Sequence, residues 1–279
     1  MAVARRSRWR LPFSGWHLLL MPTALVFVLP LFWMIMTSFM PNGDINTFPP
    51  KFLPSRISLA GYSSLFTDSD ILRWLANTTV VATVAVISHL VLCSLAGYGF
   101  ARLRFVGRTP SFFLIVATIM VPIQLLMIPT FLLFSRMRVI DTLTAVAIPW
   151  LASAFGIFLM RQFFLALPVE LEDAARLDGC NRLQVFYRVV LPLAKPALAT
   201  LAIFTLLGSW NDLIWPLIAI NDDQWWTLQL GLANFQGQRR TEWQLLMAGN
   251  VIATLPLLIG FIAAQRQFVA TMTFSGLKG

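Results

Sequence analysis

The sequence predicts an all-α protein that crosses a membrane six times. Hydrophobic residues make up 58% of its 279 residues and charged residues only 12%, whereas soluble domains carry about 25% charged residues. Several apolar runs reach the length of about 20 residues that a helix needs to cross a bilayer. Basic residues gather at the ends of these runs. Together these observations indicate a polytopic membrane protein.

The first expected span is 16–39, which follows arginines at 5, 6, 8 and 10. The run is longer than the apolar part of a signal peptide, and no cleavage site of small residues follows it, so we expect an uncleaved helix. Five further spans are expected, at 74–100, 111–134, 143–164, 197–220 and 244–264. Prolines such as Pro122 are tolerated inside a span where neighbouring helices satisfy the backbone.

Charge placement predicts the orientation of these spans. Of the 21 lysines and arginines, 14 fall in segments placed in the cytosol and 7 in outer segments, which is the asymmetry of the positive-inside rule. The predicted parts are a cytosolic N-terminus at 1–15, a membrane domain at 16–264 and a cytosolic tail at 265–279. The net charge of +9 is therefore interpreted as a topology signal rather than as a surface for nucleic acid.

The outer loop 221–243 is expected to lie at the membrane surface. It contains Trp225, Trp226 and Trp243, and tryptophans are typical of the aromatic belt at a membrane–water interface.

The sequence lacks the common catalytic and metal-binding patterns. Its two cysteines, Cys93 and Cys180, fall in different environments, and neither histidine has a partner at metal-ligand spacing. No glycine precedes any of the three lysines, so the chain has no phosphate-binding P-loop. Any ATPase that drives this protein must therefore be a separate subunit.

One long polar stretch, 170–196, interrupts the apolar sequence. Four of its residues recur at helical spacing and share one face: Leu171, Ala174, Ala175 and Asp178. Gly179 is expected to end this helix, and a second helix is expected over 182–190, before Pro192. The stretch is therefore predicted to form a helix–turn–helix between two spans.

This stretch resembles the cytoplasmic coupling loop of permease subunits in ABC importers. The family pattern is Glu-Ala-Ala, three residues, Gly, nine residues and Ile-x-Leu-Pro. The chain keeps every spacing, with the landmarks Asp173, Ala174, Ala175, Gly179, Val189, Leu191 and Pro192. Asp173 replaces Glu and Val189 replaces Ile, and both changes keep the chemistry. The surrounding layout resembles the second permease of carbohydrate importers such as the maltose and glycerol-phosphate systems.

The resemblance implies a fold, partners and site residues. It implies the type I ABC importer permease fold, with both termini in the cytosol. It implies a heterodimer with a second permease chain, and two ATPase subunits that bind ATP and Mg. It also implies an extracytoplasmic solute-binding protein or lipoprotein that delivers a carbohydrate. No cofactor is expected in this chain. The coupling loop spans 165–196, and the residues expected to act on the ATPase are Glu172, Asp173, Ala174, Ala175, Asp178, Gly179, Leu191 and Pro192.

Several residues of the coupling loop allow more than one interpretation. A bulky residue at Gly179 is expected to find no room in the turn. Only one of the adjacent acids Glu172 and Asp173 can face the ATPase squarely, and Asp173 holds the acidic position of the motif. Asp173 could instead only stabilise its helix through the helix dipole. The loop could also lie on the membrane, but its acidic first half would be repelled by anionic lipid.

Asp212 is the one acidic residue well within an expected span, and a carboxylate in a membrane is costly. With Asn211 it resembles a Trp-Asn-acidic signature of carbohydrate permeases. Two interpretations stay open: Asp212 lines the translocation path, or it is hydrogen bonded within the helix packing. A proton relay is disfavoured because no second buried carboxylate accompanies it.

The predicted function is the permease subunit of an ATP-driven, binding-protein-dependent carbohydrate importer in the bacterial inner membrane. The alternative from another class is a secondary transporter or channel. Such a protein would be expected to show inverted repeats and buried ion-coupling charges, and neither is evident. A membrane enzyme would need a catalytic constellation, and none is evident either.

Overall fold

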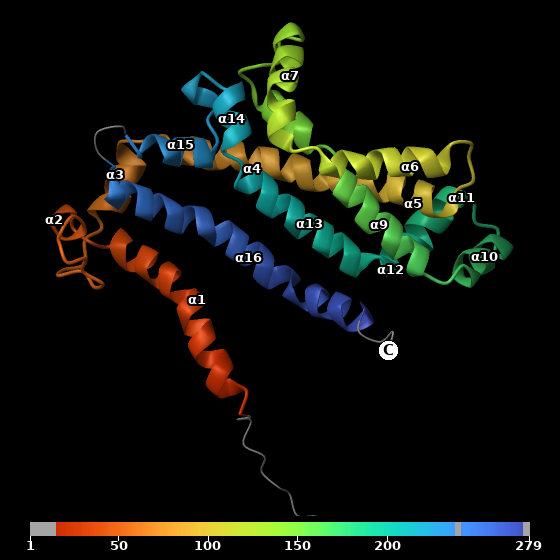
Figure 1. Cartoon of the computed structure of the whole chain (residues 1–279), viewed down its shortest axis with the longest axis horizontal. Helices are drawn as coiled ribbons and strands as arrows, with labels where there is room; N and C mark the ends of the chain where they lie inside the picture. Colours follow the sequence, from red (N-terminus) through yellow and green to blue (C-terminus); the bar gives the residue numbers. More distant parts are fainter. Residues whose placement is uncertain (1–14, 238–240, 276–279) are drawn as a thin grey trace, which may run out of the picture. The chain divides into compact units, whose positions relative to one another are not determined.

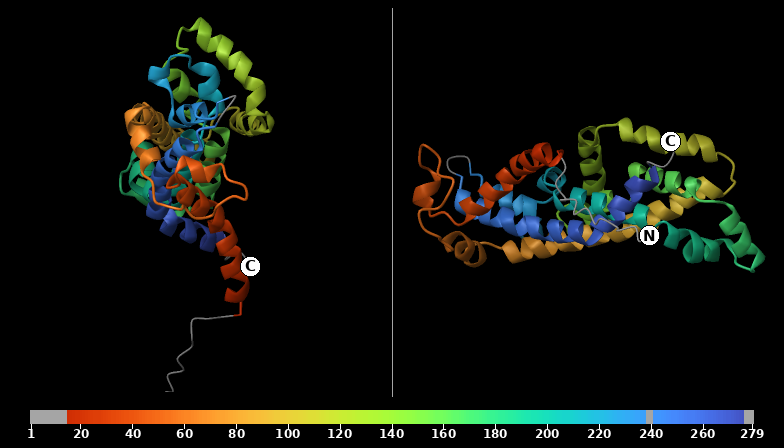
Figure 2. Two further views of the ribbon diagram at one scale, coloured as in Figure 1. Left: turned by 90° about the vertical axis from the view of Figure 1, so that its left-hand side faces the viewer. Right: turned by 90° about the horizontal axis from the view of Figure 1, so that it is seen from below.

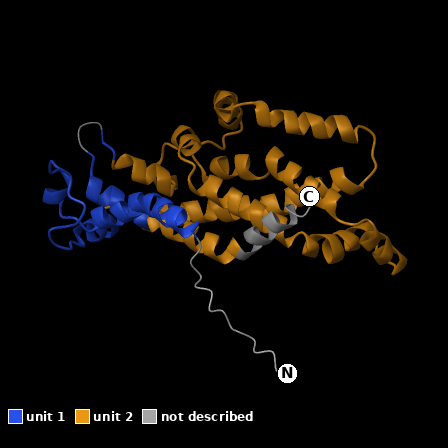
Figure 3. Cartoon of the chain, turned by 60° about the horizontal axis from the view of Figure 1, so that its bottom comes forward, with its two compact units in different colours: residues 1–67, 236–251 blue, residues 68–235, 252–279 orange. Residues whose placement is uncertain are grey.

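The computed structural model describes residues 15–237 and 241–275 and is almost entirely helical (Figure 1). Within these residues the only strand pairing is an isolated bridge between Gln236 and Thr241, so the all-α prediction is confirmed. The basic residues at 5–10, 239, 240 and 278, which entered the orientation count, lie outside the described residues. The chain divides into two compact units (Figure 3): unit 1 contains 1–67 and 236–251, and unit 2 contains 68–235 and 252–279.

Unit 1 begins with the first expected span. Its helices are α1 (His17–Ser38), α2 (Asn42–Ile45), α3 (Ala60–Thr67) and the first part of α16 (Trp243–Ser275). α1 is continuous through Pro22 and Pro30, and most of its apolar side chains are exposed. A helix that is apolar all round is suited to a membrane span.

The loop of unit 1 that follows α1 is ordered around Asp44. The Asp44 carboxylate accepts hydrogen bonds from Lys51 Nζ at 2.5 Å, from the backbone N–H of Ser55 at 2.8 Å and from the Ser55 hydroxyl. These donors, Lys51 first among them, lower the pKa of Asp44 to about 2. A carboxylate that accepts several hydrogen bonds is stabilised in its charged form.

Unit 2 contains the second to fifth expected spans as a series of helices, together with the rest of α16. Their bounds are α4 (Ile71–Ser88), α5 (Ser94–Arg102), α6 (Arg108–Ala117), α7 (Ile123–Arg136), α8 (Leu143–Ala147), α9 (Ala154–Ala166), α10 (Glu170–Leu177), α11 (Arg182–Val185), α12 (Leu191–Leu193), α13 (Lys195–Trp210), α14 (Ile214–Ala219) and α15 (Leu228–Asn234). A π-helical turn, His89–Cys93, joins α4 to α5.

Four helical stretches of the described chain are long and apolar enough to cross a membrane: 17–38, 71–102, 143–166 and 243–265. Two further stretches bend sharply, 108–136 by 103° and 182–210 by 78°. The structure therefore contains four candidate spans, or up to six if each bent pair counts as one.

The third and fifth expected spans are not the continuous helices that the sequence predicts. The third breaks at Val121, which adopts an extended conformation before Pro122, as the residue before a proline favours. The fifth ends at Trp210, and α14 begins only at Ile214. Pro216 explains this break, because a proline ring clashes with the helical carbonyl four residues earlier, here that of Asp212.

Two buried apolar clusters hold unit 2 together. One lies where α5 and α9 pack together and includes Tyr98, Phe164 and Val190. The other includes Val81 and Trp215, and Trp225 and Trp226 pack against it. Both tryptophans are partly buried, so the packing of unit 2 holds them in place. α10 and α11 lie at the opposite end of unit 2 from α15 (Figures 1 and 2).

Candidate functional site

The polar stretch 170–196 forms the predicted helix–turn–helix. α10 ends in a Schellman motif, in which the backbone N–H of Cys180 donates to Ala175 O and that of Gly179 donates to Arg176 O, both at 3.0 Å. Gly179 adopts a φ of +85°, a left-handed conformation that costs other residues free energy. No atom lies within 4 Å of the Cβ position at Gly179. Within this chain the constraint is therefore the backbone angle rather than a lack of room.

The second helix begins at a capping box and runs further than expected. The Asn181 side chain accepts the Gln184 N–H at 2.9 Å, and the Gln184 side chain accepts the Asn181 N–H at 2.8 Å. The helix was expected to end before Pro192, but it continues to Leu193 through the π-helical turn Phe186–Val190. A π turn shifts the hydrogen-bond ladder, which accommodates the missing N–H of Pro192.

Glu172 points into unit 2. Its side chain is 2% exposed, and its carboxylate forms an ion pair with Arg102 at 2.6 Å. The Tyr98 hydroxyl donates to the same carboxylate at 3.0 Å. Arg102 also donates to the carbonyl of Leu167 at 2.6 Å. Glu172 therefore fastens α10 to the end of α5, and its charge is matched inside the chain rather than presented to a partner.

The outward face of the loop contains most of the other expected residues. Asp173, Ala174, Asp178, Gly179 and Pro192 are exposed. Ala175 and Leu191 are half-buried and pack against the cluster around Phe164. Asp173 Oδ1 accepts a hydrogen bond from Arg176 at 3.0 Å, and both side chains are exposed. The loop thus separates residues that anchor it from residues that remain free to meet another molecule.

Sequence reasoning missed two residues of this outward face. Leu177 is 90% exposed and Leu183 is 62% exposed, and they flank the turn at Gly179. Leucines on both sides of a glycine in a polar stretch were the available signal. An exposed leucine alone needs no explanation, but two beside one turn provide an apolar surface for docking.

Asp212 lies at the break between α13 and α14, where its carboxylate accepts hydrogen bonds from two N–H groups. The Trp150 Nε1–H donates to Asp212 Oδ2 at 3.1 Å, and the backbone N–H of Trp215 donates to Oδ1 at 3.4 Å. Within the part of the chain that the structure describes, no lysine or arginine forms an ion pair with Asp212. Its charge is therefore balanced only by N–H dipoles.

A cavity of about 340 Å³ lies beside Asp212. Its other polar lining residues are His89, Gln124, Thr130 and Ser153, and Trp150 is part of the wall. Asp212 thus both faces a cavity and is hydrogen bonded, so the structure is compatible with both sequence interpretations of this residue. Sequence reasoning did not find Trp150, which is 62 residues away in the chain.

Asn211 lies outside this cavity. Its side-chain amide donates to Leu207 O at 2.8 Å, and its carbonyl oxygen accepts from Gln229 Nε2 at 3.4 Å. Its side chain is exposed, so it stands beside the cavity residues without joining them.

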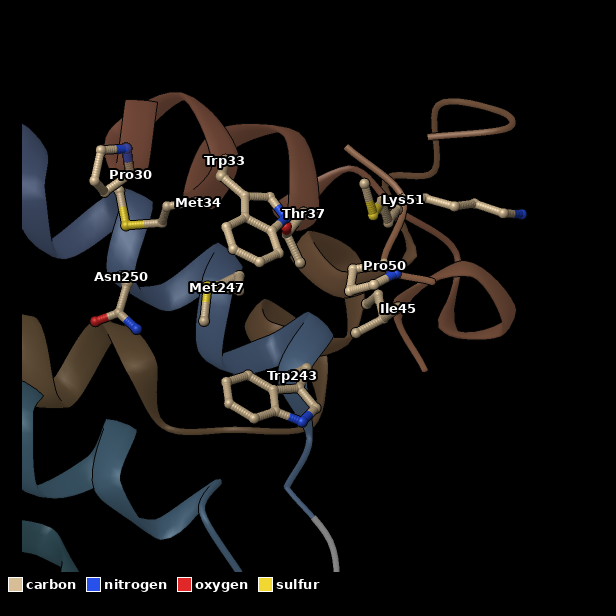
Figure 4. Close-up of a pocket in the computed structure, with 11 residues that line it drawn as sticks. Pro30, Trp33, Met34, Thr37, Ile45, Pro50, Lys51, Trp243, Met247 and Asn250 are labelled. Atoms are coloured by element: carbon tan, nitrogen blue, oxygen red, sulfur yellow. The ribbon is translucent and has the colours of Figure 1, made fainter. Parts of the chain in front are cut away.

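A larger hollow of about 640 Å³ lies in unit 1 (Figure 4). Trp33 from α1 and Trp243 and Met247 from α16 form much of its wall. Its one lysine, Lys51, points away from the hollow and pairs with Asp44. The hollow in unit 1 therefore offers mainly apolar packing surface.

The described residues contain no group of three or more potential metal ligands.

These features define a class of protein: a polytopic membrane protein in which a helix–glycine–helix loop is fastened to the neighbouring apolar helices. The chain belongs to the family of binding-protein-dependent transport system inner membrane components, whose model matches residues 90–273.

Several relatives are similar along nearly the whole chain. The arabinooligosaccharides transport system permease protein AraQ of Halalkalibacterium halodurans is 36% identical over 92% of this chain and 93% of its own length. The lactose transport system permease protein LacG of Rhizobium radiobacter is 32% identical over 95% of this chain and 96% of its own length. A solved bacterial ABC transporter for import of the acidic polysaccharide alginate matches with a TM-score of 0.78 and 25% identity. That match covers 93% of this chain and 100% of that one.

The comparisons confirm the predicted family, the membrane location and the ABC importer permease fold. They also confirm that this chain is the permease, since the ATPase is a separate subunit in these systems.

Proposed function

We propose that this chain is the permease subunit of an ATP-driven, binding-protein-dependent carbohydrate importer that works by alternating access. The substrate class is supported by the relatives, whose names refer to arabinooligosaccharides and lactose. The observation that carries the coupling role is the outward face of the loop around Gly179. That face is exposed in this chain and is fastened to α5 through Glu172.

Its partners are a second permease chain, two ATPase subunits and an extracytoplasmic solute-binding protein. The second permease fits the apolar side chains of α1, most of which are exposed; membrane lipid covers what remains. The ATPase subunits bind ATP and Mg. A solved alginate ABC transporter is in complex with a periplasmic binding protein, which supports the same type of partner here.

The proposed topology has six spans within 16–264. The bent stretch 108–136 counts as one span, and the fifth span, 197–220, begins after the coupling loop ends at 196. The N-terminus at 1–15 and the tail at 265–279 lie in the cytosol. The distribution of basic residues supports this orientation.

In the transport cycle, ATP closes the ATPase dimer and brings the two coupling loops together. Asp173, Ala174, Asp178 and Gly179 form the docking face, with Leu177 and Leu183 beside them. Glu172, Ala175 and Leu191 hold that face on the membrane helices, so its movement turns the spans outward. The binding protein then releases substrate into the opened path, which Asp212 lines and Asn211 borders. Hydrolysis restores the inward-facing state.

The coupling role is tested by two substitutions at one position, in the reconstituted complex with its binding protein. Gly179→Ala and Gly179→Leu meet a similar backbone cost at φ +85°. Within the chain the alanine methyl group meets no other atom, because no atom lies within 4 Å of the Cβ position. The leucine therefore differs from the alanine chiefly in what it presents to a partner.

We expect Gly179→Leu to abolish uptake and binding-protein-stimulated ATP hydrolysis, while Gly179→Ala keeps a large part of both. Equal activities in the two variants would contradict the docking role. Uptake by the wild type that continues without ATP would favour the secondary transporter instead.

The position of Asp212 in the translocation path is tested by Asp212→Cys, which should react with a small water-soluble thiol reagent in at least one state of the cycle. Protection in every state, with unchanged uptake kinetics for Asp212→Asn, would favour a purely structural role.

A further inference from the structure

The ring of Trp150 is held at two opposite edges. At one edge, its Nε1–H donates to Asp212 Oδ2 at 3.1 Å. At the other, the ring abuts the backbone of α13 at Gly208, where a Cβ would lie 2.7 Å from Cη2 and 2.9 Å from Cζ3. Only glycine permits this approach. The orientation of the indole plane is therefore fixed by the fold before any ligand arrives.

The faces of this ring are not used by the chain's own aromatic packing. The ring pairs found among the described residues do not include Trp150, and neither do the cation–π contacts. Trp150 is half-buried and forms part of the wall of the 340 Å³ cavity. That volume lies at the lower end of the range of about 300–1,000 Å³ that small-molecule sites occupy.

The polar groups of the cavity select for the charge of a ligand. Gln124, Thr130 and Ser153 offer neutral donors and acceptors, and Asp212 offers a carboxylate. No lysine or arginine lines the cavity. Its one histidine, His89, is buried, and its Nδ1 lies 3.0 Å from Ala85 O. A ligand carboxylate would lie near Asp212 without a cation to compensate, whereas like charges in a site of low dielectric repel each other. Hydroxyl groups, in contrast, can donate to Asp212 and exchange hydrogen bonds with the neutral groups.

We propose that this cavity is a sugar-binding subsite of the permease. In it the indole face of Trp150 stacks on the C–H face of an uncharged sugar ring, while Asp212 accepts hydroxyl hydrogen bonds. The inference rests on the proposed function, because it assigns a carbohydrate to the path of an importer. It adds a residue, Trp150, and a substrate class, neutral rather than acidic sugars.

The test measures binding directly, in the purified complex without its binding protein. Gln124→Cys places a thiol on the exposed wall of the cavity, in a background with Cys180→Ser; the buried Cys93 is left in place. Labelling by a small thiol reagent is followed by the mass of this chain. Arabinotriose is the neutral probe and trigalacturonate the acidic one. We expect arabinotriose to slow labelling at 124 and trigalacturonate not to do so.

Two further substitutions test whether the ring face of Trp150 contacts the sugar. Trp150→Phe keeps an aromatic face but loses the Nε1–H, whereas Trp150→Leu loses the face as well. We expect Trp150→Leu to weaken the protection by arabinotriose about 2- to 10-fold, the range that a lost aromatic contact gives. Trp150→Phe should keep most of the protection. As a control, labelling of Asp173→Cys, at an exposed position, should not respond to sugar.

Three results would overturn the subsite. They are equal protection in the phenylalanine and leucine variants, equal protection by the acidic sugar, and no protection by the neutral sugar in the parent. None of these results would contradict ATP-driven transport itself. The variants Gly179→Ala and Gly179→Leu test that function separately, by uptake and ATP hydrolysis.

Discussion

Two carboxylates mark two functional regions of unit 2 and are balanced in opposite ways. Glu172, in the coupling loop, is 2% exposed and is paired with Arg102 at 2.6 Å. Asp212, beside the cavity, accepts N–H groups from Trp150 and Trp215 and has no cationic partner among the described residues. The first charge is satisfied by another charge, and the second only by dipoles.

This difference separates a structural role from one that leaves room for a ligand. Removing one partner of a buried ion pair leaves the other charge uncompensated. Removing the charge of a carboxylate that accepts only N–H groups leaves no such charge behind. The two sites should therefore respond very differently to the same change from carboxylate to amide.

The largest effect is expected at Glu172. Glu172→Gln leaves the Arg102 guanidinium, which is 10% exposed, without its counter-charge. Breaking a buried pair in this way costs about 3–5 kcal/mol. We expect a clear fall in the thermal unfolding midpoint of the complex and earlier proteolysis of the coupling loop. Glu170→Gln is the matched control, because Glu170 is an exposed residue of the same helix and forms no ion pair among the described residues. This variant should behave as the wild type.

A second substitution at Arg102 sharpens this prediction. The double variant Glu172→Leu with Arg102→Met removes both charges, so no buried charge is left without its counter-charge, and it should recover part of the lost stability. The Tyr98 hydroxyl and the Leu167 carbonyl still lose a hydrogen-bond partner, which limits the recovery. If the single and double variants are equally unstable, the ion pair is not the source of the cost.

The next effect is expected at Gly208, which sets the position of Trp150. In Gly208→Ala the new methyl group would lie 2.7 Å from Cη2 of a rigid ring, and overpacking of this type costs about 1–3 kcal/mol. The thermal midpoint of the complex should fall accordingly. Gly99→Ala is the control, because no atom lies within 4 Å of that Cβ position. A loss of stability in the control equal to that at Gly208 would show that the ring is not responsible.

A smaller effect on stability is expected for Asp212→Asn. The asparagine carbonyl oxygen can still accept the Trp150 Nε1–H, and one hydrogen bond contributes about 0.5–1.5 kcal/mol. We therefore expect the thermal midpoint to change little while uptake of a neutral sugar falls. A destabilisation as large as that of Glu172→Gln would remove the contrast between the two carboxylates.

The smallest effect is expected for Asp173→Asn. Asp173 and Arg176 form an exposed pair at 3.0 Å, with 59% and 46% of their side chains exposed, and exposed pairs contribute about 0.2–1 kcal/mol. Folding should be unaffected. If Asp173 instead meets a cation of the ATPase, Asp173→Lys should uncouple ATP hydrolysis from uptake, and a charge reversal on the ATPase should restore it. Without such rescue in an assembled complex, stabilisation of the helix dipole remains the explanation.

The sequence by itself determined the features that depend on neighbouring residues. Run length and composition predict the membrane spans, because a bilayer requires about 20 apolar residues in a row. The spacing around Gly179 predicts the helix–turn–helix, because a left-handed residue after a helix favours glycine. The family follows from the same local landmarks, from Asp173 to Pro192.

Only the tertiary structure decided which way the polar side chains face. Glu172 and Asp173 are adjacent in the chain, yet Glu172 is buried and Asp173 is exposed. The reason is that Tyr98 and Arg102 lie on one side of α10 only, where they contact Glu172. Glu172 meets Tyr98 across 74 residues, and Asp212 meets Trp150 across 62. No local pattern encodes such pairs. They form because a polar group removed from water must find a partner wherever the packing brings one near.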